Sequence, residues 1–318
     1  MNSGIKVSQP LLRKCLPMLS WTAQGRSVVK PRNDSFASGD QLLWRQNEDR
    51  LRLTRTPDGL LAAVSDGAGG AGLFCGPWAE TLVTRLPKTP ITSMKALNQW
   101  MDGFCLNFRA DHAALSKATP ARHSKFIREG SFATLVAGWL AYRRGRAMLQ
   151  WLGYGDSQLM VFDRTGRQPA LAASYPATLS ALDRAPFLLN WKDMPREASL
   201  HGGEMVLPDR ATVVLASDGI GQYLLLRTLA SLPRSQASGG MLNEFMRLSG
   251  GESKLGQAAR AHRATPGPGI SGELATLRDC LKSDMSFAVR IRALCDKGLL
   301  ANDDATLIMI DVDLTRNR

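Results

Sequence analysis

The sequence predicts an α+β protein with antiparallel sheets and with helices segregated from the strands. Short apolar runs bounded by turn residues recur along the 318 residues and alternate with longer helical stretches. Several strands follow one another directly, without the regular strand–helix–strand alternation of a doubly wound parallel sheet. Apolar residues make up 44% of the chain, which is enough for a large buried core.

The N-terminal half begins this pattern with a buried strand. Residues 60–64 (LLAAV) are apolar on both faces and stop at Ser65-Asp66-Gly67. Two helices and three further strands are then expected, at 76–86, 92–116, 131–141, 147–153 and 157–163.

The C-terminal half repeats the strand signal once. Residues 213–216 form a second buried strand, which again ends in Ser-Asp-Gly, at 217–219. The Pro- and Asp-rich stretch 168–205 predicts long loops. Helix is expected within 221–249 and over 272–298, with glycine-rich loops at 249–251 and 264–269 and a last strand at 307–314.

Charge and composition narrow the function classes. The chain carries 40 Lys and Arg against 28 Asp and Glu, a formal net charge of +12. Such a balance suits nucleic acid, an acidic membrane surface or a phosphoprotein. Because there is no polybasic tract and no aromatic platform for stacking bases, we expect no dedicated nucleic-acid binding.

The location is predicted from the N-terminus and the cysteines. Residues 1–22 form an N-terminal arm, and 23–318 form the folded domain. The arm lacks the continuous apolar run of a secretory signal. No stretch reaches the roughly 18 to 20 apolar residues of a membrane helix. The five cysteines form no pair at ligand or disulfide spacing. We expect a cytoplasmic monomer.

The informative feature is a recurrence of aspartates at strand ends. Asp66 and Asp218 each follow an apolar strand in the same Ser-Asp-Gly context, and Asp303 stands just before the last strand. Asp156 lies between two strands. One Asp-Gly is an ordinary turn signal, but several carboxylates converging on one place need a hard cation to offset their repulsion. Oxygen ligands suit Mg²⁺ or Mn²⁺, and the four scattered histidines argue against zinc.

Five segments, taken in order, resemble a known motif set. LLAAVSDGAGGAG, GSFATLVAGWL, GYGDSQLMVF, VVLASDGI and NDDATLIMI resemble the motifs of type 2C Ser/Thr protein phosphatases, the metal-dependent family, particularly its bacterial members. The resemblance covers about residues 25–315. It implies an α-β-β-α sandwich, in which two antiparallel sheets are flanked by helices.

The resemblance also implies a chemistry. Two Mn²⁺ or Mg²⁺ ions would be held by Asp66 (bridging), the Gly67 carbonyl, Asp218 and Asp303, with Asp156 at a third, weaker metal position. A hydroxide on the metal pair would attack phosphorus directly, without a covalent phosphoenzyme. The implied substrates are phosphoserine and phosphothreonine proteins, and the implied partner is a cognate Ser/Thr kinase.

Two positions depart from the family pattern. Ala68 stands where many members have a histidine proposed as proton donor. Asp304 replaces the usual asparagine after the metal ligand, and its extra carboxylate is a further candidate metal ligand.

The first-strand acid and the phosphate-binding cation stay open. Asp34, in PRNDSF, is favoured as the acid that completes the catalytic set, and Asp49, in QNED, is the alternative. Neither has an arginine five residues earlier, where the family often grips phosphate. The candidate cations are Lys30, Arg32 and Arg45.

Two other functions compete with the phosphatase. The missing histidine, the missing arginine and the changed asparagine favour a non-catalytic domain that binds phosphoproteins or a partner kinase. The basic charge alone favours a nucleic-acid-binding protein.

Overall fold

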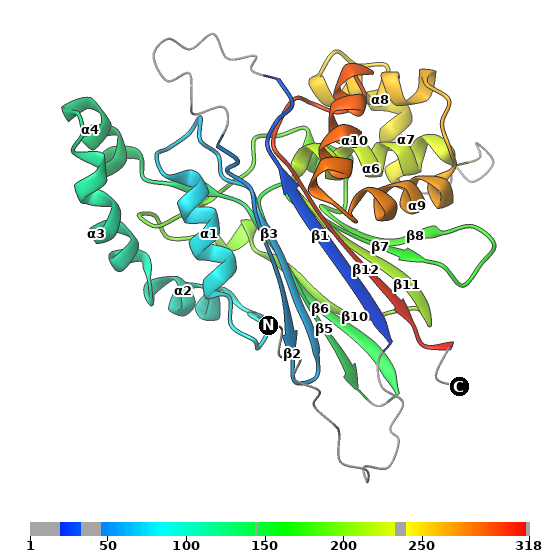
Figure 1. Ribbon diagram of the computed structural model, residues 1–318, viewed down its shortest axis with the longest axis horizontal. Coiled ribbons are helices and arrows are strands. Elements are labelled where there is room, and N and C mark those ends of the chain that lie inside the picture. The colour runs from blue at the N-terminus through cyan, green and yellow to red at the C-terminus, as the bar shows by residue number, and fades with distance from the viewer. Residues whose placement is uncertain (1–19, 33–45, 144, 233–239, 316–318) are drawn as a thin grey trace, which may run out of the picture.

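The computed structural model describes residues 20–32, 46–143, 145–232 and 240–315, and its centre is a pair of five-stranded sheets (Figure 1). Their strand orders are β1-β12-β11-β7-β8 and β10-β6-β5-β3-β2, and β4 pairs with β9 in a small third sheet. Every strand pairing is antiparallel. The predicted α+β class and the sandwich of two antiparallel sheets flanked by helices are confirmed.

The strands are β1 Trp21–Val28, β2 Arg50–Thr56, β3 Gly59–Ser65, β4 Phe132–Ala133, β5 Leu135–Arg143, β6 Arg146–Tyr154, β7 Gln158–Asp163, β8 Ala170–Tyr175, β9 Leu189–Asn190, β10 His201–Val206, β11 Arg210–Ala216 and β12 Ala305–Asp313. The helices are α1 Cys75–Arg85, α2 Met94–Asp102, α3 Cys105–Ser116, α4 Pro120–Glu129, α5 Leu179–Leu182, α6 Asp218–Ser231, α7 Gly240–Leu248, α8 Lys254–Ala264, α9 Ile270–Cys280 and α10 Asp284–Asp296, with a 3₁₀ turn at Glu197–Ser199.

Three clusters of buried apolar side chains hold this sandwich together. In β3, Leu60, Ala62 and Val64 pack between the two sheets, whereas Leu61 and Ala63 pack under the helices that cover the outer face. Successive side chains of a strand point to opposite faces. A strand buried on both faces is therefore apolar throughout, which explains the continuous LLAAV run.

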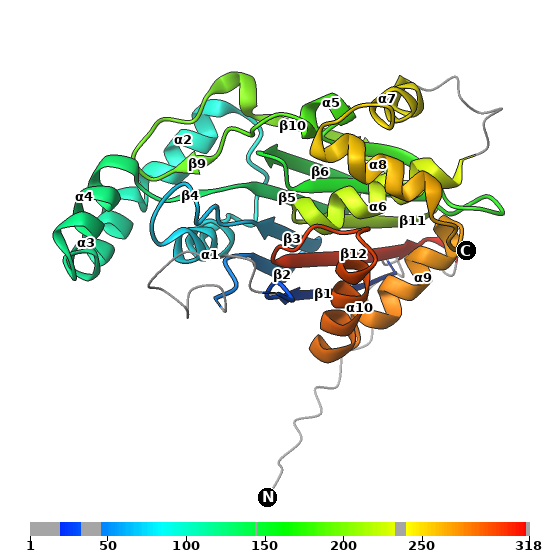
Figure 2. The same cartoon turned by 90° about the horizontal axis from the view of Figure 1, so that it is seen from above.

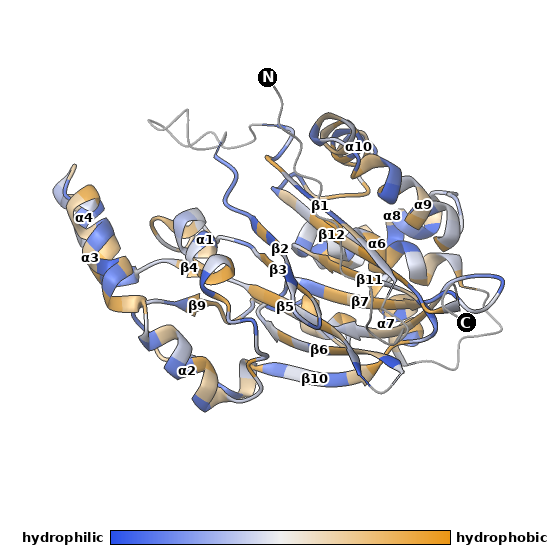
Figure 3. Ribbon diagram, turned by 60° about the horizontal axis from the view of Figure 1, so that its bottom comes forward, coloured by the Kyte–Doolittle hydropathy of each residue, from blue (hydrophilic) through white to orange (hydrophobic). Residues whose placement is uncertain are grey.

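The helices divide into two groups, one on each sheet. Helices α1–α4 cover the sheet that contains β3, and α6–α10 cover the sheet that contains β12 (Figures 1 and 2). Figure 3 shows apolar colouring along the central strands β3, β5, β11 and β12, with mixed colouring on the helices around them. Helices with one apolar face fit this position on the outside of a sheet.

The loop predicted over 168–205 is partly wrong, because it contains β8, α5, β9 and the start of β10. Strands β8 and β10 lie at sheet edges, and β10 is exposed along most of its length. An edge strand without a buried face lacks the apolar pattern that marks a strand in the sequence.

The predicted helices are broken at capped positions. The 92–116 helix is two helices, separated at Gly103 and Phe104, and the 272–298 helix breaks before Ser283, which caps the N-terminus of α10. Strand β2 and helices α4 and α8 were not predicted. Strand β1 begins at Trp21, inside the predicted 1–22 arm. Among the described residues, no helix is both long enough and apolar enough to cross a membrane.

Candidate functional site

Five aspartates from separate segments lie at one end of the sandwich. Asp66 follows β3 and Asp49 precedes β2, and these strands pair antiparallel with Arg50 opposite Ser65. Asp218 follows β11 and Asp303 precedes β12, with Ala216 opposite Leu307. Asp156 lies between β6 and β7. Antiparallel pairing brings the end of one strand beside the start of its neighbour, so the register places Asp49 beside Asp66 in one sheet and Asp218 beside Asp303 in the other. The packing of the two sheets then brings both pairs to the same end of the sandwich.

The Asp66 segment is fixed by a buried threonine of the neighbouring loop. The Asp66 backbone N–H donates to Thr134 Oγ1 at 3.0 Å, and the Thr134 N–H donates to the Asp66 carbonyl at 2.9 Å. Thr134 Oγ1 also lies 2.5 Å from Ser157 Oγ, next to Asp156. Gly155, at φ 100°, packs against Thr134, so close that a Cβ there would lie 2.8 Å from the Thr134 methyl. Thr134 thus links the Asp66 and Asp156 loops.

The Asp218 and Asp303 segments are held by a second reciprocal pair. The Ser217 N–H donates to the Thr306 carbonyl, and the Thr306 N–H donates to Ser217 Oγ, both at 2.9 Å. Asp218 opens helix α6, and its Oδ1 accepts from the Gly219 N–H at 2.5 Å. This places a carboxylate at the positive end of the helix dipole.

Burial and mutual repulsion raise the pKa values of Asp66 and Asp218, two members of this group. The pKa of Asp66 is well above its ordinary value because of burial and then the charges of Asp49, Asp218, Asp303 and Asp156. Burial, followed by Asp156, Asp303 and Asp49, raises the pKa of Asp218 to about 8. Because the charges of the other four carboxylates all act on Asp66, the five share one electrostatic environment.

Asp49, the alternative first-strand acid, lies inside this group. It is 1% exposed, and burial followed by the charge of Asp304 raises its pKa to about 7. Its carboxylate lies beside Ser217, Thr306 and Asp66, yet among the described residues neither oxygen has a partner at hydrogen-bond geometry. Burying two carboxylate oxygens without hydrogen-bond partners costs free energy. A bound ligand or ion that contacts these oxygens would offset that cost. Asp34, the favoured acid, falls outside the described residues.

Asp304 fastens the first-strand segment to β12. Its Oδ1 accepts from the Lys30 N–H at 2.9 Å, and its Oδ2 accepts from the Glu48 N–H at 2.7 Å. Asp304 is 7% exposed, and burial raises its pKa. Both oxygens of this candidate metal ligand therefore already accept backbone N–H groups.

Glu48, which the sequence analysis did not single out, closes the glycine-rich loop. Its carboxylate lies so near Gly69 that a Cβ there would be 1.9 Å from Glu48 Oε2. Burial and then the charge of Asp304 raise the pKa of Glu48, while Lys30 and the backbone N–H groups of Gly76 and Gly69 act in the opposite direction. A side chain at position 69 would therefore force the Glu48 carboxylate to move.

The candidate phosphate-binding cations lie in different places. The charge of Lys30 reaches both Glu48 and Asp304, so its ammonium borders the carboxylates. Arg32 is directed to the end of α10, where it donates to the Cys295 carbonyl at 3.0 Å and lies 3.8 Å from Asp296. The structure does not bring Arg32 to the carboxylates. Arg45 falls outside the described residues.

The histidines lie away from the carboxylates. His112 stacks on Phe108, His123 bonds Ser116, His201 contacts Tyr175, and His262 bonds the Leu299 carbonyl. The Ala68 N–H donates a hydrogen bond to the Phe132 carbonyl, and its side chain has no titratable group. Burial raises the pKa of neighbouring Cys75 to about 12, which keeps its thiol protonated.

The donor set fits a hard divalent cation in kind, although not in its present rotamers. The group offers carboxylate oxygens and the Gly67 carbonyl, the ligands that Mg²⁺ and Mn²⁺ prefer. Among the described residues, however, no three acidic, His or Cys side chains are arranged so that they could hold one metal ion. Asp218 and Asp303 each turn an oxygen to the N–H of the next residue instead.

Two cavities, with volumes of about 580 and 410 Å³, lie elsewhere, and no carboxylate of the group lines either of them. The sequence analysis missed Glu48, Thr134, Ser157, Ser217 and Thr306. The four hydroxyl residues could have been found from the sequence, because each is a Ser or Thr inside or next to an apolar run.

The comparisons with known proteins give architecture only. No family model matches the sequence, and no curated protein matches it significantly. Among solved structures, the serine/threonine phosphatase Stp1 from Staphylococcus aureus is 13% identical, with 95% of this chain and 100% of that chain covered and a TM-score of 0.44. The catalytic domain of the serine threonine protein phosphatase PstP, in complex with two manganese ions, is 14% identical, with 93% and 100% covered and a TM-score of 0.42. A bacterial serine phosphatase is 14% identical, with 92% and 98% covered and a TM-score of 0.44.

Proposed function

We propose that the chain is a phosphatase that hydrolyses phosphoserine and phosphothreonine in proteins and depends on Mn²⁺ or Mg²⁺. One observation carries the proposal. Five carboxylates from distant segments lie at one end of the sandwich, where burial and neighbouring carboxylates raise the pKa values of Asp49, Asp66, Asp156 and Asp218. Such an arrangement costs free energy unless a cation offsets it.

Some residues of the site would bind metal ions, and others position those ligands. Asp66, Asp218 and Asp303, with the Gly67 carbonyl, would hold two ions, and Asp156 would reach a third. When bound, the ions supply positive charge for phosphoryl oxygens and a water of lowered pKa. Asp218 and Asp303 must first rotate away from their neighbouring N–H groups. Asp304 is assigned to the positioning residues because both of its oxygens accept backbone N–H groups.

Asp49 is assigned the role of first-strand acid. Its unpartnered oxygens, beside Asp66, can accept hydrogen bonds from a water at the site. Lys30 is assigned the role of binding the substrate phosphate, because its charge already acts on Glu48 and Asp304 beside the site. A phosphorylated protein is an anionic partner for a chain of net charge +12.

The test is hydrolysis of p-nitrophenyl phosphate and of a phosphothreonine peptide with Mn²⁺ and with EDTA. Asp66→Asn, Asp218→Asn and Asp303→Asn should each abolish metal-dependent turnover. Asp58→Asn, at the exposed turn between β2 and β3, is the matched control and should leave it unchanged. Turnover that survives in Asp66→Asn or in excess EDTA contradicts the proposal.

Ala68 favours a second candidate, a non-catalytic domain that binds phosphoproteins or a partner kinase. No histidine or other titratable side chain stands at that position of the glycine-rich loop. Calorimetric titration separates the two functions. Tight Mn²⁺ binding without turnover of any phosphopeptide favours the binding role, and metal-dependent turnover favours the enzyme.

A further inference from the structure

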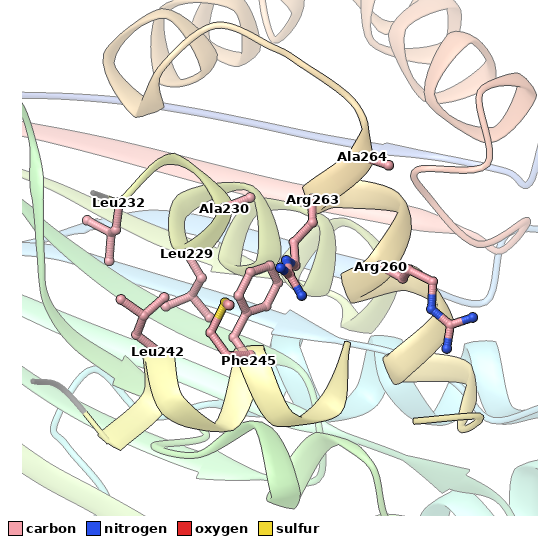
Figure 4. A pocket seen from close by; sticks show the side chains of 9 residues that line it. Leu229, Ala230, Leu232, Leu242, Phe245, Arg260, Arg263 and Ala264 are labelled. Carbon is pink, nitrogen blue, oxygen red and sulfur yellow. The ribbon is translucent and has the colours of Figure 1, made fainter. Parts of the chain in front are cut away.

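An apolar cavity lies in the helical layer between α6, α7 and α8, away from the carboxylates (Figure 4). Its volume is about 580 Å³, within the usual range of sites for small organic ligands. Leu229 of α6 and Leu242 and Phe245 of α7 form much of the wall. Met246 also lines it and is 38% exposed, so the apolar surface reaches solvent.

A guanidinium group stands at one side of this cavity. Figure 4 shows Arg263 reaching from α8 toward Phe245. Within the part of the chain that the structure describes, its one hydrogen bond goes to a neutral group, Ser249 Oγ, at 2.5 Å. Among the described residues, Arg263 is within ion-pair distance of no carboxylate, so most of its donors and its whole charge stay available.

Arg260, the second cation that lines the cavity, is bound to backbone carbonyls. Figure 4 shows its side chain pointing away from Phe245. Its Nε donates to the Ser249 carbonyl at 3.1 Å and its terminal nitrogen to the Gly251 carbonyl at 2.7 Å. These bonds satisfy carbonyls at the end of α7. Arg260 therefore holds the wall, and Arg263 is the group that can meet a ligand.

We propose that this cavity binds an amphiphile with one apolar chain and one anionic head, a carboxylate or a phosphate. The apolar wall would take up the chain, and the fork of Arg263 would meet two oxygens of the head. A cationic head would be repelled. The attraction of a cation to the last turn of α8 favours an arginine there. Its hydrogen bond to Ser249 Oγ, just after α7, holds the side chain beside the apolar cavity.

The test is calorimetric titration of the full chain with dodecanoate and dodecyl phosphate below their micelle concentrations. Dodecyl maltoside and dodecyltrimethylammonium, with neutral and cationic heads, are the comparison ligands. We expect the two anionic ligands to bind at one site and at least tenfold more tightly than the comparison ligands. Shortening the chain should weaken binding by about fourfold per methylene.

Two variants and one control locate the site. Arg263→Gln should weaken the anionic ligands about tenfold and leave dodecyl maltoside unchanged. Ala230→Phe, which fills the cavity from α6, should weaken all the ligands. Arg247→Gln, an exposed arginine of α7 outside the lining, should change nothing. Thermal melts show whether each variant folds.

The proposal is overturned by three results. These are no binding of either anionic ligand, equal binding of the cationic ligand, or anionic binding that Arg263→Gln and Ala230→Phe leave intact. None of these measurements uses phosphatase activity, so their outcome is independent of the function proposed for the carboxylate site.

Discussion

The carboxylate of Asp304 accepts a hydrogen bond from the backbone N–H of Glu48, 256 positions away in the chain, at 2.7 Å. Its other oxygen holds the Lys30 N–H, so one side chain ties two N-terminal segments to the start of β12. The bond fixes Glu48 against the glycine-rich loop and Asp49 among the carboxylates. Asp304 thus helps to position Asp49, the residue to which we assign the first-strand acid role.

Asp304→Ala should destabilise the protein by about 1–3 kcal/mol, because it leaves two backbone N–H groups without acceptors. Relief of repulsion with Asp303 offsets part of this loss. Urea denaturation measures the effect. Asp163→Ala is the matched control, since its carboxylate bonds only Thr165, two residues away. Equal losses in the two variants would remove the long-range role from Asp304.

Asp49→Asn should lower Mn²⁺-dependent turnover by about tenfold or more, the usual effect of removing an acid that orients groups at a metal site. Asp34→Asn should change turnover by less than about threefold if Asp49 is the first-strand acid. Initial rates with p-nitrophenyl phosphate at several Mn²⁺ concentrations measure both variants. The reverse order of effects would restore Asp34 to the role.

Thr134→Val should cost about 1–3 kcal/mol and weaken Mn²⁺ binding about tenfold, because the Asp66 N–H loses its acceptor and Ser157 its partner. Urea denaturation and calorimetric titration measure the two effects. Thr228→Val is the control. Thr228 is also buried, at 2% exposed, but its hydroxyl bonds only the Leu224 carbonyl in its own helix. If metal affinity changes equally in both variants, the link through Thr134 has no part in the site.

Asp218→Asn should stabilise the metal-free protein at pH 7, because the raised pKa of the buried Asp218 carboxyl, about 8, makes its burial costly and asparagine does not titrate. Asparagine also keeps an oxygen that can accept from the Gly219 N–H. Added Mn²⁺ should raise the melting temperature of the wild-type chain and leave that of the variant nearly unchanged. Thermal melts of both proteins in EDTA and in Mn²⁺ measure these two effects. A wild-type melting temperature that does not respond to Mn²⁺ or Mg²⁺ counts against a metal site.

His262 should make stability fall in weak acid. Burial lowers its pKa to about 4; Arg227 adds to the lowering, while Glu273 and the Leu299 carbonyl oppose it. Tyr223 packs against the ring, and Arg290 pairs with Glu273. Since the folded chain favours the neutral ring, the contribution of His262 is full above pH 6.5 and is lost as the pH falls toward 4.

The variant His262→Gln isolates this contribution, which has an upper bound of about 3 kcal/mol. Urea denaturation at pH 7, 5.5 and 4.5 should show the stability difference between wild type and variant narrowing as the pH falls. Glutamine keeps a donor for the Leu299 carbonyl without titrating. A difference that stays constant over this range would exclude the ring as the titrating group.

The sequence by itself determined the central strands and the aspartates at their ends. Residues 60–64 and 307–314 are apolar at every position or nearly so because both faces of β3 and β12 are buried, and that pattern is local. The edge strand β10 and the breaks at Gly103 and Ser283 were missed, because an exposed strand has no apolar pattern and a cap is a single residue.

Only the tertiary structure decided which groups stand together. Asp49 acquires its environment from Ser217, Thr306 and Asp66, residues brought to it by strand register and by the packing of the two sheets. Likewise Arg32 is drawn to α10 and Arg263 to an apolar cavity, although both are basic residues in polar stretches of the sequence. The sequence determines which residues carry a charge. The burial and the neighbours of each charged group, which determine its free energy, arise only when distant segments pack together.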